Sequence, residues 1–202
     1  KNRAELFAAT RPNNLPAITL FHLVGVRLAL VATGNTGVYW KLVLREPQLW
    51  MTIIAINLVS ATSMIVNDYY DATLGRDVYK SESSSHNLLL RHDNPVAAAT
   101  VQRFLMYLYG TALLIATTLP GTSTRLAVVA SLIMTFLYTK FLKPMTWVKN
   151  IVCASIVAFS PWASGSAALH ILQADNVFAV PALFRMFGVL FFGLVGREIL
   201  MD

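Results

Sequence analysis

The stretch LWMTIIAINLVSATSMIV, residues 49–66, is apolar enough to sit in lipid, and NDYYDATLGRD, residues 67–77, follows it directly. About 20 mainly apolar residues are needed for a helix to cross the hydrocarbon core of a bilayer. The run is continuous rather than alternating, which favours a helix over a strand. The sequence therefore predicts a membrane helix that ends in a group of acidic residues.

The whole chain has the composition of an integral membrane protein. Of its 202 residues, 56% are hydrophobic and only 13% are charged, and the mean hydropathy is +0.58. A soluble domain is typically about 25% charged. Only helices or closed barrels satisfy every backbone hydrogen bond in lipid, and the apolar runs are helical in pattern. We predict one all-α membrane domain over residues 1–202, with about six spans at 15–33, 49–66, 101–119, 126–142, 147–172 and 180–201.

The basic residues are distributed unequally between the two sides that these spans define. One side carries Lys1, Arg3, Arg11, Arg76, Lys80, Arg91, Arg103, Lys140, Lys143, Lys149 and Arg197, and the other carries Lys41, Arg45 and Arg125. By the positive-inside rule, the first side faces the cytoplasm or its organellar equivalent. We therefore attribute the net charge of +6 to the basic residues that set the membrane topology, and we predict no nucleic-acid binding.

Three side chains within the predicted spans are not ordinary lipid-facing residues. Arg27 and Arg185 are costly in hydrocarbon, so we expect Arg27 to reach the far interface and Arg185 to mark a span boundary. Cys153 is the single cysteine, and we expect it to be a small packing residue in a helix.

The acidic group after residue 66 has the spacing of a binding site. Asn67 and Asp71 are four residues apart and Asp68 and Asp71 are three apart, which places all three on one helix face. Asp77 follows the flexible Gly75 and can fold back toward that face. Crowded carboxylates near lipid are costly, and a Mg²⁺ ion that carries a phosphorylated ligand relieves the cost. The alternative is a solvated helix end with ordinary surface acids.

Basic residues on the same side complement such a ligand. Arg76, Lys140, Lys143, Lys149 and Arg197 could neutralise a departing diphosphate, although such residues also set topology or meet anionic lipid headgroups. Arg11 is a further candidate, because Pro12 and Pro16 stiffen its segment and direct it to headgroup level; the alternative is an interfacial anchor.

These residues resemble a known family. Residues 67–77 are similar to the first aspartate-rich motif of the UbiA superfamily of intramembrane prenyltransferases, which in one branch is NDxxDxxxGxD. Arg11-Pro12 precedes the first span as in that family, and YTKFLK at 138–143 resembles its Tyr-to-Lys signature. GREILMD at 196–202 resembles the start of the second aspartate-rich motif. The ordered set covers nearly the whole chain.

The resemblance implies a helical bundle, usually of nine spans, around a cavity with metal and diphosphate at its mouth. Asn67, Asp68, Asp71 and Asp77 would hold Mg²⁺, with Asp68 and Asp71 catalytic, and Asp202 would begin a second metal site. Arg76, Lys143 and Lys140, joined by the candidate Arg11, would bind the diphosphate. Loss of diphosphate would leave an allylic carbocation that an acceptor captures.

Two departures from the family pattern leave alternatives open. The sequence stops at Asp202, so we expect a C-terminally incomplete domain, and residues 94–99 read NPVAAA where the family often has an Arg-Pro-Leu stretch. A non-catalytic UbiA-like subunit of a larger membrane complex is the alternative to an enzyme. A transporter with an acidic ion path is disfavoured, because its acids would lie near the bilayer midplane.

The substrates implied by the resemblance are broad. The donor is geranylgeranyl, phytyl or longer prenyl diphosphate, and the acceptor an aromatic quinone precursor or a tetrapyrrole. Residues 67–77 favour the menaquinone or phylloquinone branch, whereas GREILMD favours other branches. Among membranes, the resemblance to enzymes of quinone and chlorophyll biosynthesis favours the plastid thylakoid over the bacterial inner membrane or the mitochondrion.

Overall fold

The computed structural model describes residues 2–74, 89, 96–143, 146–173 and 179–201, and every regular element in these segments is helical. In chain order they are α1 (Asn2–Ala9), η1 (Pro12–Asn14), α2 (Leu15–Ala32), η2 (Thr36–Val38), α3 (Tyr39–Arg45), α4 (Pro47–Thr73), α5 (Ala98–Thr118), α6 (Thr122–Leu137), η4 (Tyr138–Leu142), α7 (Thr146–Ile171) and α8 (Ala179–Met201). The predicted all-α membrane bundle is confirmed.

The predicted spans correspond to observed helices. Within the described residues, five helical stretches are long and apolar enough to cross a membrane: Pro12–Ala32, Pro47–Thr73, Ala98–Thr118, Thr122–Leu142 and Asn150–Ile171. The sixth predicted span is α8, a helix of 23 residues. The main difference is in α4, which continues from the predicted end at residue 66 to Thr73. Asn67, Asp68 and Asp71 therefore lie on a continuation of the membrane helix.

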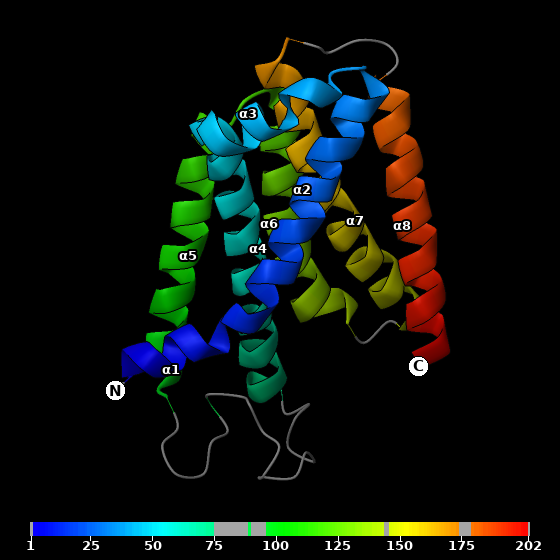
Figure 1. Ribbon diagram of the computed structural model, residues 1–202. Helices are drawn as coiled ribbons and strands as arrows, with labels where there is room; N and C mark the ends of the chain where they lie inside the picture. Colours follow the sequence, from blue (N-terminus) through cyan, green and yellow to red (C-terminus); the bar gives the residue numbers. More distant parts are fainter. Residues whose placement is uncertain (1, 75–88, 90–95, 144–145, 174–178, 202) are drawn as a thin grey trace.

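The connections alternate between the two ends of the bundle. In Figure 1, α1, the end of α4 and the C-terminal end of α8 lie at one end, whereas α3 lies across the other. At this far end Arg27 donates to the carbonyl oxygen of Thr36 at 3.1 Å, and its guanidinium lies 5.5 Å from the ring centre of Tyr39. Arg27 therefore contacts residues at the end of the bundle that carries α3, and its reach to a membrane interface stays a prediction. Arg185, by contrast, lies within α8 and does not mark its boundary.

The helices α4 and α7 form the centre of the bundle. About half of the most apolar window of each is buried, 56% and 50%, against 11% for α5. Helix α7 packs against α2, α4, α6 and α8, while α5 and α8 lie at opposite edges (Figure 1). Edge side chains such as Leu114 and Phe192 are exposed, as expected for surfaces that face lipid tails.

The closest helix crossing joins α2 to α7 through glycine. A Cβ atom at Gly25 would lie 2.2 Å from the carbonyl oxygen of Pro161, and one at Gly165 would lie 3.0 Å from the carbonyl oxygen of Gly25. Ser164 adds a hydrogen bond across the crossing, because its Oγ donates to the carbonyl oxygen of His22 at 3.0 Å. Small residues and hydroxyl bonds of this kind hold helices together in lipid, where the hydrophobic effect does not.

We predict that Gly25→Ala destabilises the protein by about 1–3 kcal/mol, the usual cost of overpacking, measured as thermal unfolding in detergent. Gly110→Ala is the matched control, since Gly110 also lies inside a membrane helix but a Cβ atom there would meet no heavy atom within 4 Å. Equal melting temperatures for the two variants would contradict this account of the crossing.

Candidate active site

The extension of α4 brings the predicted acidic residues to the end of the bundle. Asp68 and Asp71 are only 7% and 2% exposed, although the helix there lies beyond the apolar run. Asn67 Nδ2 donates to Asp71 Oδ2 at 3.0 Å, which confirms that residues 67 and 71 share a face. The carboxylates are thus held within the protein, a different environment from that of a solvated helix end.

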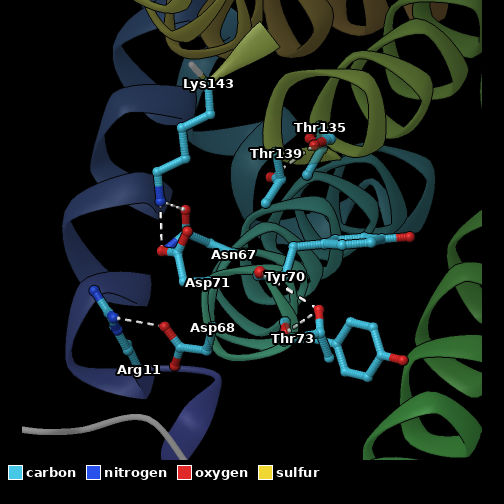
Figure 2. Close-up of polar contacts among 10 residues, drawn as sticks. Arg11, Asn67, Asp68, Tyr70, Asp71, Thr73, Thr135, Thr139 and Lys143 are labelled. Carbon is cyan, nitrogen blue, oxygen red and sulfur yellow. Dashed lines mark hydrogen bonds and ion pairs between the residues drawn. The ribbon is translucent and has the colours of Figure 1, made fainter. Parts of the chain in front are cut away.

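Lys143 joins this face from a segment more than 70 residues away. Its Nζ donates to Asn67 Oδ1 at 2.7 Å and forms an ion pair with Asp71 Oδ2 (Figure 2). Asp71 therefore accepts hydrogen bonds from both an amide and an ammonium group. Hydrogen bonds with ionised partners are roughly twice as strong as neutral ones, so this three-residue group fixes the position of Lys143 against α4.

A local change in helix geometry places Lys143. After α6 the chain forms the π-helical turn η4, and the backbone N–H of Lys143 donates to the carbonyl oxygen of Tyr138 at 2.8 Å. The donor and acceptor of this bond are five residues apart in the sequence, against four in an α-helix. The wider turn changes the direction in which the side chains after it point. Single π-helical turns inside helices occur frequently at functional sites.

Arg11 reaches the same helix end from the other side of the site. Its Nη2 forms an ion pair with Asp68 Oδ1 at 3.2 Å (Figure 2). Arg11 has φ 51° and ψ 60°, a left-handed conformation that costs a non-glycine residue about 1–2 kcal/mol. The strained residue joins α1 to η1, and its guanidinium reaches Asp68 of α4.

In the described part of the chain, the site contains the ion pairs Arg11–Asp68 and Lys143–Asp71, which come from three separate segments. The side chains of Asp68 and Asp71 are 10% and 3% exposed, whereas those of Arg11 and Lys143 are 44% and 24% exposed. The cations thus cover the acids on the solvent side. Removal of one partner from a buried pair costs more than removal of an exposed pair, because it leaves a buried charge uncompensated.

Lys140 lies elsewhere. It is exposed, and its Nζ lies 6.0, 5.5 and 5.0 Å from the ring centres of Tyr70, Phe136 and Phe141. The structure places Lys140 against these rings and brings Lys143 to the acids. The contact of Lys140 with diphosphate stays a prediction, and the position of Lys140 against the rings does not support it.

Three predicted site residues, Arg76, Asp77 and Asp202, lie outside the described residues, as does the side chain of Lys149. Within the described residues, no group of three or more His, Cys, Asp or Glu side chains is arranged to hold a metal. The donors present are two carboxylates and the amide oxygen of Asn67. Such hard oxygen donors fit Mg²⁺, which usually takes one or two carboxylates and completes its shell with water and substrate phosphate.

A cavity of about 560 Å³ lies directly beside the acids, between α2, α4, α6, η4 and α7. Asn67 belongs both to its wall and to the group with Lys143. On α4 the wall consists of Ile56, Val59, Ser60, Ser63, Met64 and Asn67. From Ile56 to Asn67 the helix rises eleven steps, roughly 16 Å at about 1.5 Å per residue, so the cavity extends from the acids along the apolar part of α4.

The cavity wall is amphipathic. Hydroxyl groups come from Ser60, Ser63, Ser131, Thr135, Tyr138, Thr139 and Ser160, and apolar side chains from Ile18, Phe21, Ile56, Val59, Met64, Ile156 and Val157. A cavity of this size accommodates a small organic ligand with a few oriented polar contacts.

Sequence reasoning missed most of this cavity. Cys153, which we expected to be a packing residue, lines its wall. The polar residues of α4 gave a usable signal, since Ser60, Ser63 and Asn67 follow helical spacing. The contributions of α6 and α7 depend on tertiary packing and left no comparable signal in the sequence.

A bundle of membrane helices with paired acids and cations at the mouth of an amphipathic internal cavity has the architecture of an intramembrane enzyme for lipid substrates. The model of the UbiA prenyltransferase family matches residues 18–197. The chain therefore belongs to the UbiA prenyltransferase family, and the resemblance seen in its motifs is confirmed. No curated protein and no solved structure matches the chain at a significant level.

We predict that Lys143→Met lowers the stability by roughly 3 kcal/mol, the lower end of the cost of breaking a buried ion pair, because Lys143 is partly exposed. Lys140→Met, which removes an exposed charge from the same turn, should change stability by less than about 0.5 kcal/mol. Thermal unfolding in nanodiscs measures both.

The double variant Lys143→Met/Asp71→Leu separates the ion pair from general packing. It should recover most of the lost stability, since the buried carboxylate is no longer present. No recovery, or an equal loss in Lys140→Met, would contradict the role given to the Lys143–Asp71 pair.

Proposed function

We propose that the protein catalyses Mg²⁺-dependent transfer of a prenyl group from its diphosphate to an acceptor, with the diphosphate at the acids and the chain in the cavity. One observation carries the proposal: Asn67 lies both in the group with Asp71 and Lys143 and in the cavity wall. A ligand with a charged head and an apolar tail would place each part in a matching environment. Membership in the family supports prenyl transfer as the class of reaction.

The roles of the residues follow from their chemistry. Asn67, Asp68 and Asp71 would hold Mg²⁺, with Asp77 and Asp202 as further proposed ligands. A bound Mg²⁺ supplies Lewis-acid stabilisation of the negative charge on the leaving group. Lys143 and Arg11 lie beside the acids and would stabilise the same charge as fixed cations. Arg76 and Lys140 remain further proposed contacts of the diphosphate.

The proposed reaction breaks the bond between the allylic carbon and the diphosphate oxygen. The electron pair leaves with the diphosphate, and the allylic cation takes an electron pair from the acceptor to form a new carbon–carbon or carbon–oxygen bond. The acceptor then loses a proton. Burial of the site helps this chemistry, because charges act more strongly where water is excluded.

The substrates are proposed as chemical classes. We propose geranylgeranyl, phytyl or longer donors, and an aromatic quinone precursor or a tetrapyrrole as acceptor. The hydroxyl groups of the cavity wall support an acceptor with polar groups. We further propose one prenyltransferase domain over the chain, in a plastid thylakoid membrane and within reach of partner membrane proteins.

Turnover of labelled prenyl diphosphate in nanodiscs tests the proposal, with homogentisate, dihydroxynaphthoate, 4-hydroxybenzoate and chlorophyllide as acceptors. We expect one acceptor to form a labelled product that is lost with EDTA. Asp71→Asn should lower turnover by at least about 100-fold, the scale of losing one charge-stabilising group. Glu46→Gln is the matched control, because it removes an acid that precedes α4 at the opposite end of the bundle, and should leave turnover unchanged.

Retained turnover in Asp71→Asn would exclude the metal site as assigned. No product with any acceptor, together with no Mg²⁺-dependent binding of the diphosphate, would favour the non-catalytic subunit over the enzyme.

A further inference from the structure

Helix α1 is a short segment ahead of the first membrane helix, and one of its faces is buried. Leu6, Ala9 and Thr10 are only 7%, 6% and 8% exposed, whereas Arg3 and Phe7 are exposed. Spacings of three and four residues place the buried side chains on one face of a helix. In Figure 1, α1 lies at the end of the bundle where α4 carries the acids. The helix is therefore docked against the protein on the side of the active site.

The buried face of α1 packs beside the part of α4 that leads into the acids. Leu6 and Ala9 belong to one buried cluster with Ile65 and Val66 of α4, which also contains Val96, Val101 and Leu105. Ile65 and Val66 directly precede the acidic motif in the sequence. The position of α1 is thus defined relative to the same turns of α4 that hold the active-site carboxylates.

The chain between the docked helix and Arg11 is held by hydrogen bonds. The Oγ1 atom of Thr10 donates to the carbonyl oxygen of Phe7 at 2.6 Å, and the backbone N–H of Arg11 donates to the carbonyl oxygen of Ala8 at 3.0 Å. The carbonyl oxygen of Arg11 accepts from the backbone N–H of Asn14 at 2.9 Å. Both backbone groups of Arg11 are therefore bonded, one to α1 and the other to η1.

The backbone conformation of Arg11 needs this support. Its φ of 51° and ψ of 60° are readily adopted by glycine but are costly for other residues. A strained residue persists where the structure around it over-determines its conformation. For Arg11 the supporting contacts are the docked α1 on one side and the ion pair with Asp68 at 3.2 Å on the other (Figure 2). Release of α1 would let Arg11 relax and draw its guanidinium away from α4.

We propose that α1 is a positioning element of the active site, in which Leu6 anchors the helix and thereby holds Arg11 on Asp68 and on the diphosphate. The part that concerns the diphosphate rests on the proposed function, whereas the hold on Asp68 is a property of the fold. The same turn leads to Asn14, which lines the cavity, so the docked helix also fixes one residue of the cavity wall. Leu6 acts through Arg11 and is a positioning residue.

A double-mutant cycle read by thermal unfolding in nanodiscs tests the positioning independently of activity. Arg11→Gln should lower the melting temperature of the otherwise unchanged protein, because it leaves the buried carboxylate of Asp68 uncompensated. In the Leu6→Ala background the same change should have less than half of this effect. Leu30→Ala is the matched control, since Leu30 is fully buried on α2 at the opposite end of the bundle. There Arg11→Gln should keep its full effect, because distant sites are additive.

Equal effects of Arg11→Gln in the Leu6→Ala and Leu30→Ala backgrounds would overturn the proposal. So would no effect of Arg11→Gln in the unchanged protein, because Asp68 would then not depend on Arg11. Leu6→Met, which nearly conserves the volume of the side chain, should behave as the unchanged protein does. Leu6→Val replaces Leu6→Ala in the cycle if the larger truncation prevents insertion.

Turnover of prenyl diphosphate gives a second reading of the same variants. Leu6→Ala should lower kcat roughly tenfold, the scale set by the free energy of one left-handed residue, and Leu6→Met should restore it. In the Arg11→Gln background, Leu6→Ala should change kcat by less than about twofold. A tenfold loss in both backgrounds would show that Leu6 does not act through Arg11. No turnover in the unchanged protein would contradict the proposed function instead, and the melting temperatures would then decide the positioning alone.

Discussion

The structure depends on one electrostatic constraint, the stabilisation of two carboxylates at the end of a membrane helix. Asp68 and Asp71 are buried where α4 leaves the bundle, and charges in such positions are costly unless they are paired. The pairing cations come from the turn before α2 and from the turn after η4. Because of this requirement, residues 11, 67–71 and 143 form one site although they lie far apart in the sequence.

Charge balance links this site to the chemistry of the proposed substrates. Within the described residues, the two carboxylates pair with Arg11 and Lys143, and these four charges balance. A divalent cation alone, or a polyanionic diphosphate alone, would disturb this balance, whereas the two together largely restore it. We therefore expect Mg²⁺ and the diphosphate to bind with positive coupling, typically about 5–150-fold between linked ligands. The prenyl chain, the apolar part of the donor, would lie in the cavity that begins at Asn67.

Much of the fold was predictable from sequence, and part of the site was as well. Hydropathy located the spans, and three- and four-residue spacing placed Asn67, Asp68 and Asp71 on one face, because both signals are local. The ion pair of Arg11 with Asp68 was not predictable, since it depends on a left-handed residue between two helices. The sequence favoured Lys143 over Lys140 through its place close after Tyr138, and the π-helical turn accounts for its contact with the acids. The apolar span was predicted to end at residue 66 because polar residues follow there, whereas the helical spacing of residues 67–71 agrees with the continuation of α4 to Thr73.

The most direct test of the central claim uses Cys153, the single cysteine, which lines the cavity. The rate of its reaction with a small thiol reagent is measured in nanodiscs with a non-hydrolysable prenyl thiodiphosphate, with and without Mg²⁺. If the acids hold the head and the cavity holds the chain, the analogue protects Cys153 only with Mg²⁺, and Asp71→Asn removes the protection. Protection that is independent of Mg²⁺ and of Asp71, or no protection at all, would contradict the account of acids and cavity as one site.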